Sequence, residues 1–264
     1  MLTPTARYFY DELAADYDLL YADWDASVAR QGTALDDRLT RALGPGPHDV
    51  LDCACGIGTQ ALGLAARGHH VTGTDLSPVA AARAAREATA RGLRIPAAAA
   101  DMRALPLRDA TFDAVVCADN SLPHLLTPDD VGTALGEMRR VLRPGGLLLL
   151  TTRPYDALRR ERPLSTPPAV RTGPDGRTIS FQLWHWHDDG EHYDLELFQL
   201  KPDTGEDPAP GPDHWATTVR RATYWALIRQ QLTDLAGEAG FRSAGWHEPE
   251  DTGFFQPMLT AHRP

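Results

Sequence analysis

The chain has 264 residues, 42% of them hydrophobic, and a formal net charge of −10 at pH 7. This length suits one large α/β domain or one domain with an inserted cap, and the acidic balance argues against nucleic acid or an anionic membrane as a partner. No apolar run approaches the roughly 18 residues of a membrane span, and the N-terminus lacks the apolar segment of a signal peptide. Because the three cysteines also fit a reducing compartment, we expect a cytoplasmic protein.

The N-terminal segment is aromatic and acidic. A spacing of three and four residues predicts that one helix face carries four side chains: Tyr10, Leu13, Tyr17 and Tyr21. A second helix is expected from about residue 26 to 43, because glycine and proline residues follow at 44–47. We therefore expect residues 1–44 to form an N-terminal helical lid.

Strands and helices alternate in the next part of the chain. An apolar strand at 49–54 precedes a glycine-rich turn and a short helix that starts at residue 59. Further strands are expected at 70–74, 97–100, 112–118 and 147–152, with helices at 78–91 and from 128 to about 143. This alternation predicts an α/β fold with a doubly wound, mostly parallel sheet and right-handed crossovers.

A different pattern starts after residue 156. Three extended segments predict an inserted three-stranded antiparallel β cap: 178–186, 191–200 and 216–228. A helix and two closing strands follow, at 227–239, 241–248 and 257–262. We therefore expect the cap and substrate region at 157–226, and a core made of 45–156 and 227–264.

The turn after the first strand is suited to binding a nucleotide. Gly56 and Gly58 let the backbone approach a ligand closely, and the helix that follows offers unpaired N–H groups to a negative group. The apolar run of the first strand ends on Asp52, and Asp75 lies at the end of the second strand, where a carboxylate can bind both hydroxyls of a ribose. A strand, a glycine-rich turn and a helix start, followed by an acid at the end of the next strand, together predict a nucleotide-like ligand.

Five segments resemble the motifs of class I methyltransferases that use S-adenosylmethionine. They are Leu51–Thr59, Asp75–Pro78, Ala100–Met102, Asp113–Asn120 and Leu142–Gly146. The segments Asn120–His124 and Thr152–Asp156, with the aromatic N-terminal helix, are similar to the glycine N-methyltransferase branch. The resemblance implies a seven-stranded Rossmann-like sheet and the cofactor S-adenosyl-L-methionine, which leaves as S-adenosyl-L-homocysteine.

The resemblance also implies where each part of the cofactor lies. The methionine end would lie over the turn, Asp75 would hold the ribose, and Asp101 would accept a hydrogen bond from the adenine amine. Leu76 and Met102 would pack on the adenine ring, and Ala118 would lie under the sulfonium. The complete implied cofactor site is Trp24, Arg30, Asp52, Cys53, Ala54, Cys55, Gly56, Gly58, Gln60, Asp75, Leu76, Ser77, Asp101, Met102 and Ala118.

The acceptor site is expected to combine the N-terminal helix, two strand ends and the cap. The predicted catalytic residues are Tyr10, Tyr17, Asn120 and His124. The predicted substrate-binding residues are Tyr21, Arg153, Tyr193, Glu196 and Tyr224. A tyrosine with a pKa of about 10 is a poor base at pH 7, so these phenols would orient the acceptor or lie against the sulfonium. The resemblance implies that Arg153 binds a substrate carboxylate, with a salt bridge to a neighbour such as Asp156 as the alternative.

Methyl transfer from a sulfonium is an in-line displacement, so the protein must hold a neutral lone pair in line and exclude water. We therefore expect a methyltransferase that acts on the nitrogen of a small amine or amino-acid-like metabolite. The alternative is a C-methyltransferase acting on an indole-like ring carbon. Alternatives of other classes are an NAD-dependent oxidoreductase, although the turn departs from GxGxxG, and a non-catalytic cofactor-binding protein.

The expected partner is a small-molecule substrate, and the sequence allows a homo-oligomer. We expect no nucleic-acid partner and no membrane partner. His185, His187 and His192 lie close together in the predicted hairpin, but no acidic or cysteine ligand completes a convincing zinc set. We therefore expect no metal.

Overall fold

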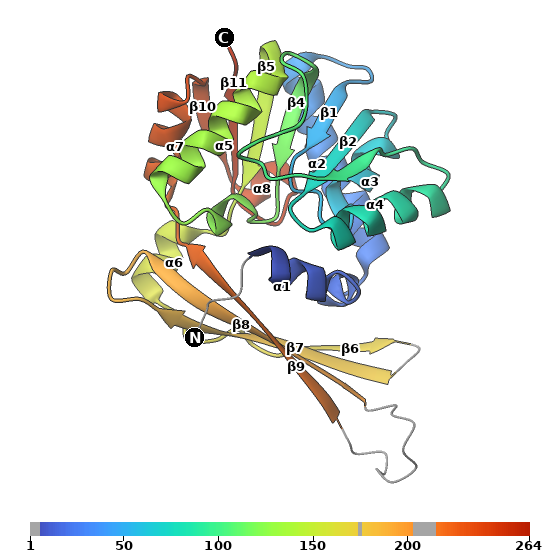
Figure 1. Ribbon diagram of the computed structural model, residues 1–264, viewed down its shortest axis with the longest axis vertical. Coiled ribbons are helices and arrows are strands. Elements are labelled where there is room, and N and C mark those ends of the chain that lie inside the picture. Colours follow the sequence, from blue (N-terminus) through green and yellow to red (C-terminus); the bar gives the residue numbers. More distant parts are fainter. Residues whose placement is uncertain (1–5, 174–175, 203–214) are drawn as a thin grey trace.

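The computed structural model describes residues 6–173, 176–202 and 215–264. It has an α/β core and an antiparallel sheet that lies across one end of the core, with helix α1 between the two (Figure 1). Among the described residues, no helix is long and apolar enough to cross a bilayer.

The core contains a seven-stranded sheet in the order β10-β11-β5-β4-β1-β2-β3. The five strands β1 to β5 run parallel, whereas β11 is antiparallel to both β5 and β10. The strand order reverses between β1 and β4, and the carboxyl ends of strands at such a point form the ligand crevice of α/β proteins. This sheet confirms the predicted mostly parallel Rossmann-like fold. Its strands are β1 (Asp49–Asp52), β2 (His70–Asp75), β3 (Ala97–Ala99), β4 (Phe112–Cys117), β5 (Leu142–Thr151), β10 (Arg242–His247) and β11 (Met258–His262).

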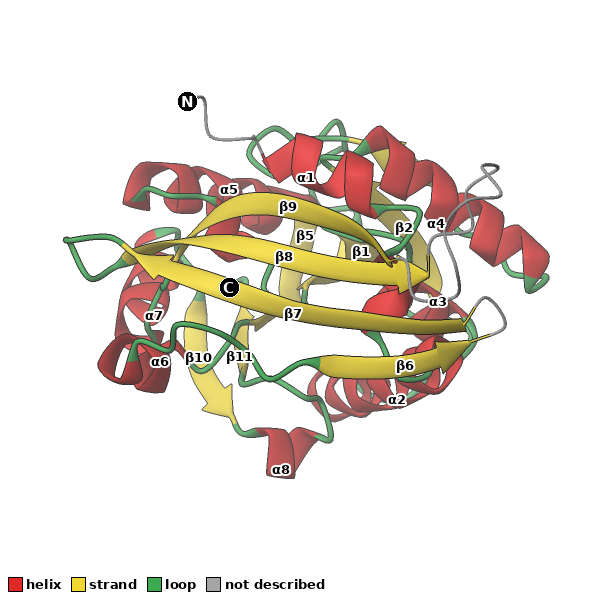
Figure 2. Cartoon of the chain, turned by 90° about the horizontal axis from the view of Figure 1, so that it is seen from below, coloured by secondary structure: helices red, strands yellow, loops and turns green. Residues whose placement is uncertain are grey.

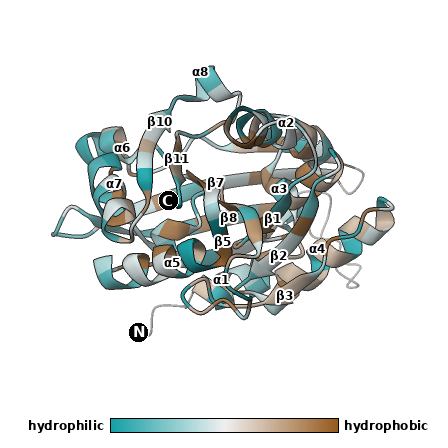
Figure 3. Ribbon diagram, turned by 90° about the horizontal axis from the view of Figure 1, so that it is seen from above, coloured by the Kyte–Doolittle hydropathy of each residue, from teal (hydrophilic) through white to brown (hydrophobic). Residues whose placement is uncertain are grey.

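Helices cover both faces of this sheet. Leu135 of α5 belongs to one apolar cluster and Leu35 of α2 to the other. The neighbouring β5 residues Leu148 and Leu149 enter opposite clusters because successive strand side chains point to opposite faces. Figure 3 shows hydrophobic residues along the central strands and hydrophilic ones on outer elements such as α8. These helices are α2 (Trp24–Leu43), α3 (Thr59–Ala65), α4 (Pro78–Ala90), α5 (Pro128–Val141), α7 (Arg229–Glu238) and α8 (Pro249–Thr252).

The cap is a four-stranded antiparallel sheet in the order β6-β7-β8-β9, and it lies across the end of the core (Figure 2). It therefore has one strand more than the sequence predicted, because the short segment of β6 shows no alternation of apolar and polar residues. Helix α6 (Tyr155–Glu161), which leads from the core to the cap, was also not predicted. The cap strands are β6 (Ala169–Gly173), β7 (Gly176–Trp186), β8 (His192–Pro202) and β9 (Trp215–Trp225).

The predicted single helix face of N-terminal tyrosines is wrong. The chain forms α1 (Ala6–Leu13), then the 3-10 helix η1 (Tyr17–Leu20), and starts α2 only at Trp24. The Asp23 carboxylate accepts a hydrogen bond from the Ala26 N–H at 2.9 Å, and a cap of this kind begins a new helix. The N-terminal segment can therefore fold around a cavity rather than lie as one straight rod.

Candidate cofactor and acceptor site

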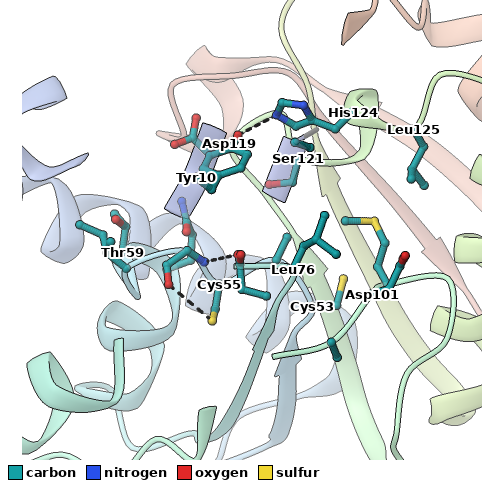
Figure 4. Close-up of a pocket in the computed structure, with 18 of the residues that line it drawn as sticks. Tyr10, Cys53, Cys55, Thr59, Leu76, Asp101, Asp119, Ser121, His124 and Leu125 are labelled. Atoms are coloured by element: carbon teal, nitrogen blue, oxygen red, sulfur yellow. Dashed lines mark hydrogen bonds between the residues drawn. The ribbon is translucent and has the colours of Figure 1, made fainter. Parts of the chain in front are cut away.

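Two cavities adjoin the carboxyl ends of the parallel strands. The first, of about 330 Å³, is lined by the glycine-rich turn, by Asp75 and Leu76 after β2, and by Asp101 and Met102 after β3. Figure 4 shows side chains from these strand ends around one space. Its volume lies at the lower end of the range for ligand pockets, about 300 to 1,000 Å³. Segments far apart in the sequence thus meet where an α/β fold binds its ligand.

The turn between β1 and α3 depends on its glycines and on Asp75. Gly56 and Gly58 have φ angles of +52° and +100°, which glycine adopts at no steric cost. The two carboxylate oxygens of Asp75 accept hydrogen bonds from the Gly56 and Ser77 N–H groups, both at 2.8 Å. Burial raises the pKa of Asp75. Because a carboxylate has about four acceptor positions, Asp75 retains capacity for the hydroxyls of a ligand.

The far end of the first cavity combines apolar side chains with one acid. Leu76, Met102 and Leu125 line it beside Asp101. The guanidinium of Arg103 bonds Asp101 at 2.6 Å and Asp130 at 2.7 Å, and its hydrogen bonds lower the pKa of Asp101. This end therefore has an apolar slot for a flat ring and a carboxylate at its edge.

The second cavity, of about 510 Å³, lies between the core, the N-terminal helices and the cap. Four residues line both cavities and mark where they adjoin: Tyr10, Tyr17, Tyr21 and Asp119. The cap side of the second cavity is lined by Gln182, Leu195, Leu197 and Tyr224, and the α2 side by Ser27, Arg30 and Gln31. A ligand in the first cavity can therefore present one end to a molecule held under the cap.

Arg153 places a guanidinium in the wall of the second cavity. It follows β5 and donates to the Tyr193 hydroxyl at 3.0 Å and the Gln182 side-chain oxygen at 3.3 Å. Its guanidinium carbon lies 4.8 Å from the ring centre of Trp184. The alternative salt bridge to Asp156 is wrong, since Asp156 instead pairs with Arg229 at 3.8 Å.

Asp119 and Asn120 form an unusual turn at the end of β4. Their φ angles are +54° and +65°, a region that non-glycine residues rarely occupy and that is often found at functional sites. The Asn120 side-chain oxygen accepts the Arg153 N–H at 3.1 Å. Asp119 lines both cavities but was not among the predicted site residues. A carboxylate directly after an apolar strand was the signal that could have identified it.

His124 and the N-terminal tyrosines form a buried polar cluster. The Tyr10 hydroxyl and His124 Nε2 are hydrogen bonded at 2.7 Å (Figure 4). Burial, together with the nearby Arg153 charge, lowers the pKa of His124 to about 3, so its ring is neutral and weakly basic at pH 7. Burial also raises the pKa of Tyr10, Tyr17 and Tyr21 well above 10. These groups therefore act as neutral hydrogen-bonding partners rather than as strong bases.

Glu196 does not join the cavity. It lies on β8 between the inward-facing Leu195 and Leu197, so its side chain points to the outer face of the cap. There it binds Arg221 at 2.7 Å and His185 at 3.3 Å. The structure thus corrects the expected position of Glu196, because strand alternation turns it away from the site.

Other predicted residues lie behind the cavity walls rather than in them. Trp24 donates to the Thr59 hydroxyl at 2.9 Å, and Ser77 caps α4. Asp52 is 1% exposed, and burial raises its pKa to about 7. The predicted residues outside both linings are Trp24, Asp52, Gly58, Ser77, Ala118, Tyr193 and Glu196, whereas Cys53, Ala54, Cys55, Gly56 and Gln60 line the first cavity.

The cap histidines each lie beside an acid. The rings of His185, His187 and His192 are within 3.3 Å of Glu196, Asp194 and Asp189, respectively. Among the described residues, no group of three or more His, Cys, Asp or Glu side chains is arranged to hold a metal ion.

Known proteins share this sequence pattern. A family model described as a methyltransferase domain matches residues 50–146. Glycine N-methyltransferase of Rattus norvegicus is 30% identical over 222 residues, which cover 74% of this chain and 69% of the relative. Glycine/sarcosine N-methyltransferase of Parasynechococcus marenigrum is 38% identical over 154 residues, 57% of this chain and 51% of the relative. The chain spans about half to two thirds of the length of the first curated relatives that it matches.

The fold is also shared with a solved structure, the S-adenosylmethionine-bound amino pentose methyltransferase of Micromonospora echinaspora. The TM-score is 0.74 at 22% identity, and the match covers 95% of each chain. The sequence similarities to methyltransferases disfavour the alternative of an NAD-dependent oxidoreductase. The chain belongs to the class I S-adenosylmethionine-dependent methyltransferases and resembles their glycine N-methyltransferase branch.

Proposed function

We propose that this protein transfers a methyl group from S-adenosylmethionine to the nitrogen of a small amine or amino-acid-like acceptor. The observation that carries this proposal is the position of Arg153, which lines the second cavity and has no carboxylate partner within ion-pair distance among the described residues. A planar guanidinium binds a carboxylate through two parallel hydrogen bonds. An acceptor with a carboxylate at Arg153 could extend its amine toward the neighbouring first cavity.

The first cavity fits the cofactor. Asp75 has acceptor capacity for the two ribose hydroxyls, and Asp101 lies at the edge of an apolar slot suited to adenine. Arg30 lies outside this cavity, at the α2 side of the second one, so it would contact the methionine carboxylate only if the cofactor extends past the residues that the two cavities share. When bound, S-adenosylmethionine supplies a methyl group attached to a sulfonium, which is already a strong electrophile.

The protein's own part in the reaction is to position the acceptor and exclude water. The cap and the N-terminal helices enclose the second cavity, and proximity in a fixed geometry can supply much of the rate. Tyr10 is held by His124, so its ring has a fixed position beside the junction. Neutral phenols there can donate a hydrogen bond or place a ring face against a cation.

Mass spectrometry of reaction products tests the proposal. The purified protein and S-adenosylmethionine would be incubated with glycine, sarcosine, larger amino acids, their methyl esters, aliphatic amines, tryptamine and indole. We expect N-methylation of at least one amine that carries a carboxylate, and weaker methylation of its methyl ester, which cannot form the bidentate contact with Arg153.

Two outcomes would contradict this expectation. Methylation of an indole carbon, with every amine nitrogen unmodified, would favour the C-methyltransferase alternative. Tight S-adenosylmethionine binding without turnover of any compound would favour a non-catalytic protein. The relatives whose names include glycine or sarcosine make those two compounds the first to test.

A further inference from the structure

The carboxylate of Asp119 lies where the two cavities adjoin. It follows β4, the strand whose carboxyl end borders the point at which strand order reverses. No lysine, arginine or histidine of the described chain forms an ion pair with it, although Arg153 is close enough to influence it electrostatically. A negative charge is thus available where a cofactor and an acceptor would meet.

The hydrogen bonds of Asp119 leave one acceptor position open. One carboxylate oxygen, Oδ2, accepts from the hydroxyls of Tyr21 at 2.9 Å and Tyr17 at 3.3 Å. The other, Oδ1, accepts only a long 3.4 Å bond from the Gln256 side-chain amide. Since a carboxylate offers about four lone-pair positions, Oδ1 can accept an N–H from a bound molecule.

The position of this carboxylate is fixed from several sides. The Asp119 N–H donates to the Thr151 hydroxyl at 2.8 Å, and that hydroxyl donates to the Gln256 side-chain oxygen at 2.9 Å. Gln256 in turn donates to Asp119. The left-handed backbone of Asp119 and Asn120 is therefore held by a closed set of contacts, as strained functional turns commonly are.

An amine acceptor needs such a group, because an ammonium ion has no lone pair to attack a methyl group. His124 is a weak base in this site, with a pKa of about 3. The nearby phenols of Tyr10, Tyr17 and Tyr21 stay protonated near neutral pH because burial raises the pKa of each. Burial also raises the pKa of Asp119, which makes it a stronger base than an exposed aspartate.

We propose that Asp119 is a catalytic residue that binds the acceptor as an ammonium ion and removes one of its protons. This inference rests on the proposed function. The acceptor N–H bond breaks and an O–H bond forms on Asp119. The freed lone pair then forms the N–C bond as the S–C bond breaks, and the electron pair of that bond remains on sulfur. A primary ammonium acceptor yields a methylammonium product, and Asp119 passes its proton to solvent when product leaves.

The variant Asp119→Asn tests this role because it keeps the size of the side chain and removes the base. With whichever amine of the panel the wild type methylates fastest, we expect kcat/KM at pH 7 to fall by about 100-fold or more. The ratio of wild-type to variant kcat/KM should be about tenfold smaller at pH 9.5 than at pH 7, because more of the amine then arrives already neutral. Arg153 keeps its charge over this range, and the buried tyrosines remain protonated, so they do not account for the change.

Three further measurements keep the test decisive. Binding of S-adenosylhomocysteine, whose sulfur is neutral, should change little and shows that the variant is folded. Asp119→Glu retains a carboxylate and should recover part of the loss. Asp109→Asn is the matched control, because Asp109 pairs with Arg140 on an exposed surface outside both cavities.

The outcomes separate this inference from the proposed function. A loss of the same size at both pH values, or no loss, would overturn the role of Asp119 and leave N-methylation intact. Failure of the wild type to methylate any amine would overturn the proposed function and this inference together.

Discussion

The two cavities differ in how the sequence builds them. The first is lined mainly by short segments at the ends of consecutive strands, β1, β2 and β3, and each segment carries a recognisable motif; the N-terminal tyrosines and the connection between β4 and α5 complete it. The second takes its walls from the N-terminal helices, two strand ends, four cap residues and a loop near residue 256. The difference indicates that the cofactor half is built mainly by local chain geometry, whereas the acceptor half is built mainly by tertiary packing.

The largest expected effect is on the cofactor half. Asp75→Ala should raise the Kd of S-adenosylmethionine by about 100-fold or more, because two hydrogen bonds donated by the ribose hydroxyls to a charged carboxylate are worth at least about 3 kcal/mol together. Calorimetric titration would measure it, with Asp75→Asn as the milder change. Unchanged affinity in a folded Asp75→Ala protein would refute the ribose assignment.

The substitution Arg153→Met tests the acceptor half of the site. We expect the KM of a carboxylate-bearing acceptor to rise about 30- to 100-fold through loss of a bidentate, charge-assisted contact, while the Kd of S-adenosylmethionine stays the same. Steady-state kinetics with an amino acid and its methyl ester would measure it, and the ester should be almost unaffected.

A matched arginine provides the control for that experiment. Arg143 pairs with Asp49 and Asp113 at the opposite end of the core strands, so Arg143→Met should leave both constants unchanged. Equal losses in cofactor and acceptor binding for Arg153→Met would instead indicate that Arg153 holds the cap together.

A pH-dependent effect should appear at Asp52, behind the turn. Burial raises its pKa to about 7, above the ordinary value of about 4. The folded state therefore binds more protons than the unfolded state between these values, and stability falls as pH rises through that window. From pH 5 to 7 this contribution amounts to about 2 kcal/mol.

Urea unfolding of the cofactor-free protein at several pH values would measure this slope. Asp52→Asn should flatten it between pH 5 and 7, because the amide does not titrate. An unchanged slope in that variant would assign the proton uptake to another buried acid, of which Asp75 is the nearest candidate.

The contrast between local chain geometry and tertiary packing also explains which parts of the site the sequence could predict. The turn at Gly56 and Gly58 and the acid at Asp75 were identifiable because each follows a strand at a short, fixed distance. The pairing of Asp119 with Gln256 joins positions 137 residues apart, and no local periodicity reports such a contact. The start of a separate helix at Trp24 is fixed by the Asp23 cap, and this signal competed with a helical spacing of aromatic residues.

The smallest expected effect tests strand alternation within the cap itself. Glu196 and its neighbours on β8 point to opposite faces, and Glu196 pairs with Arg221 on the outer one. Glu196→Gln should therefore leave kcat and acceptor KM within about twofold and cost less than about 1 kcal/mol of stability, as expected for a surface ion pair. Leu195→Ala, one position away and facing the cavity, is the matched change that should raise the acceptor KM. If Glu196→Gln were the more damaging of the two, the acceptor would have to bind on the outer face of the cap, and the second cavity could not be its site.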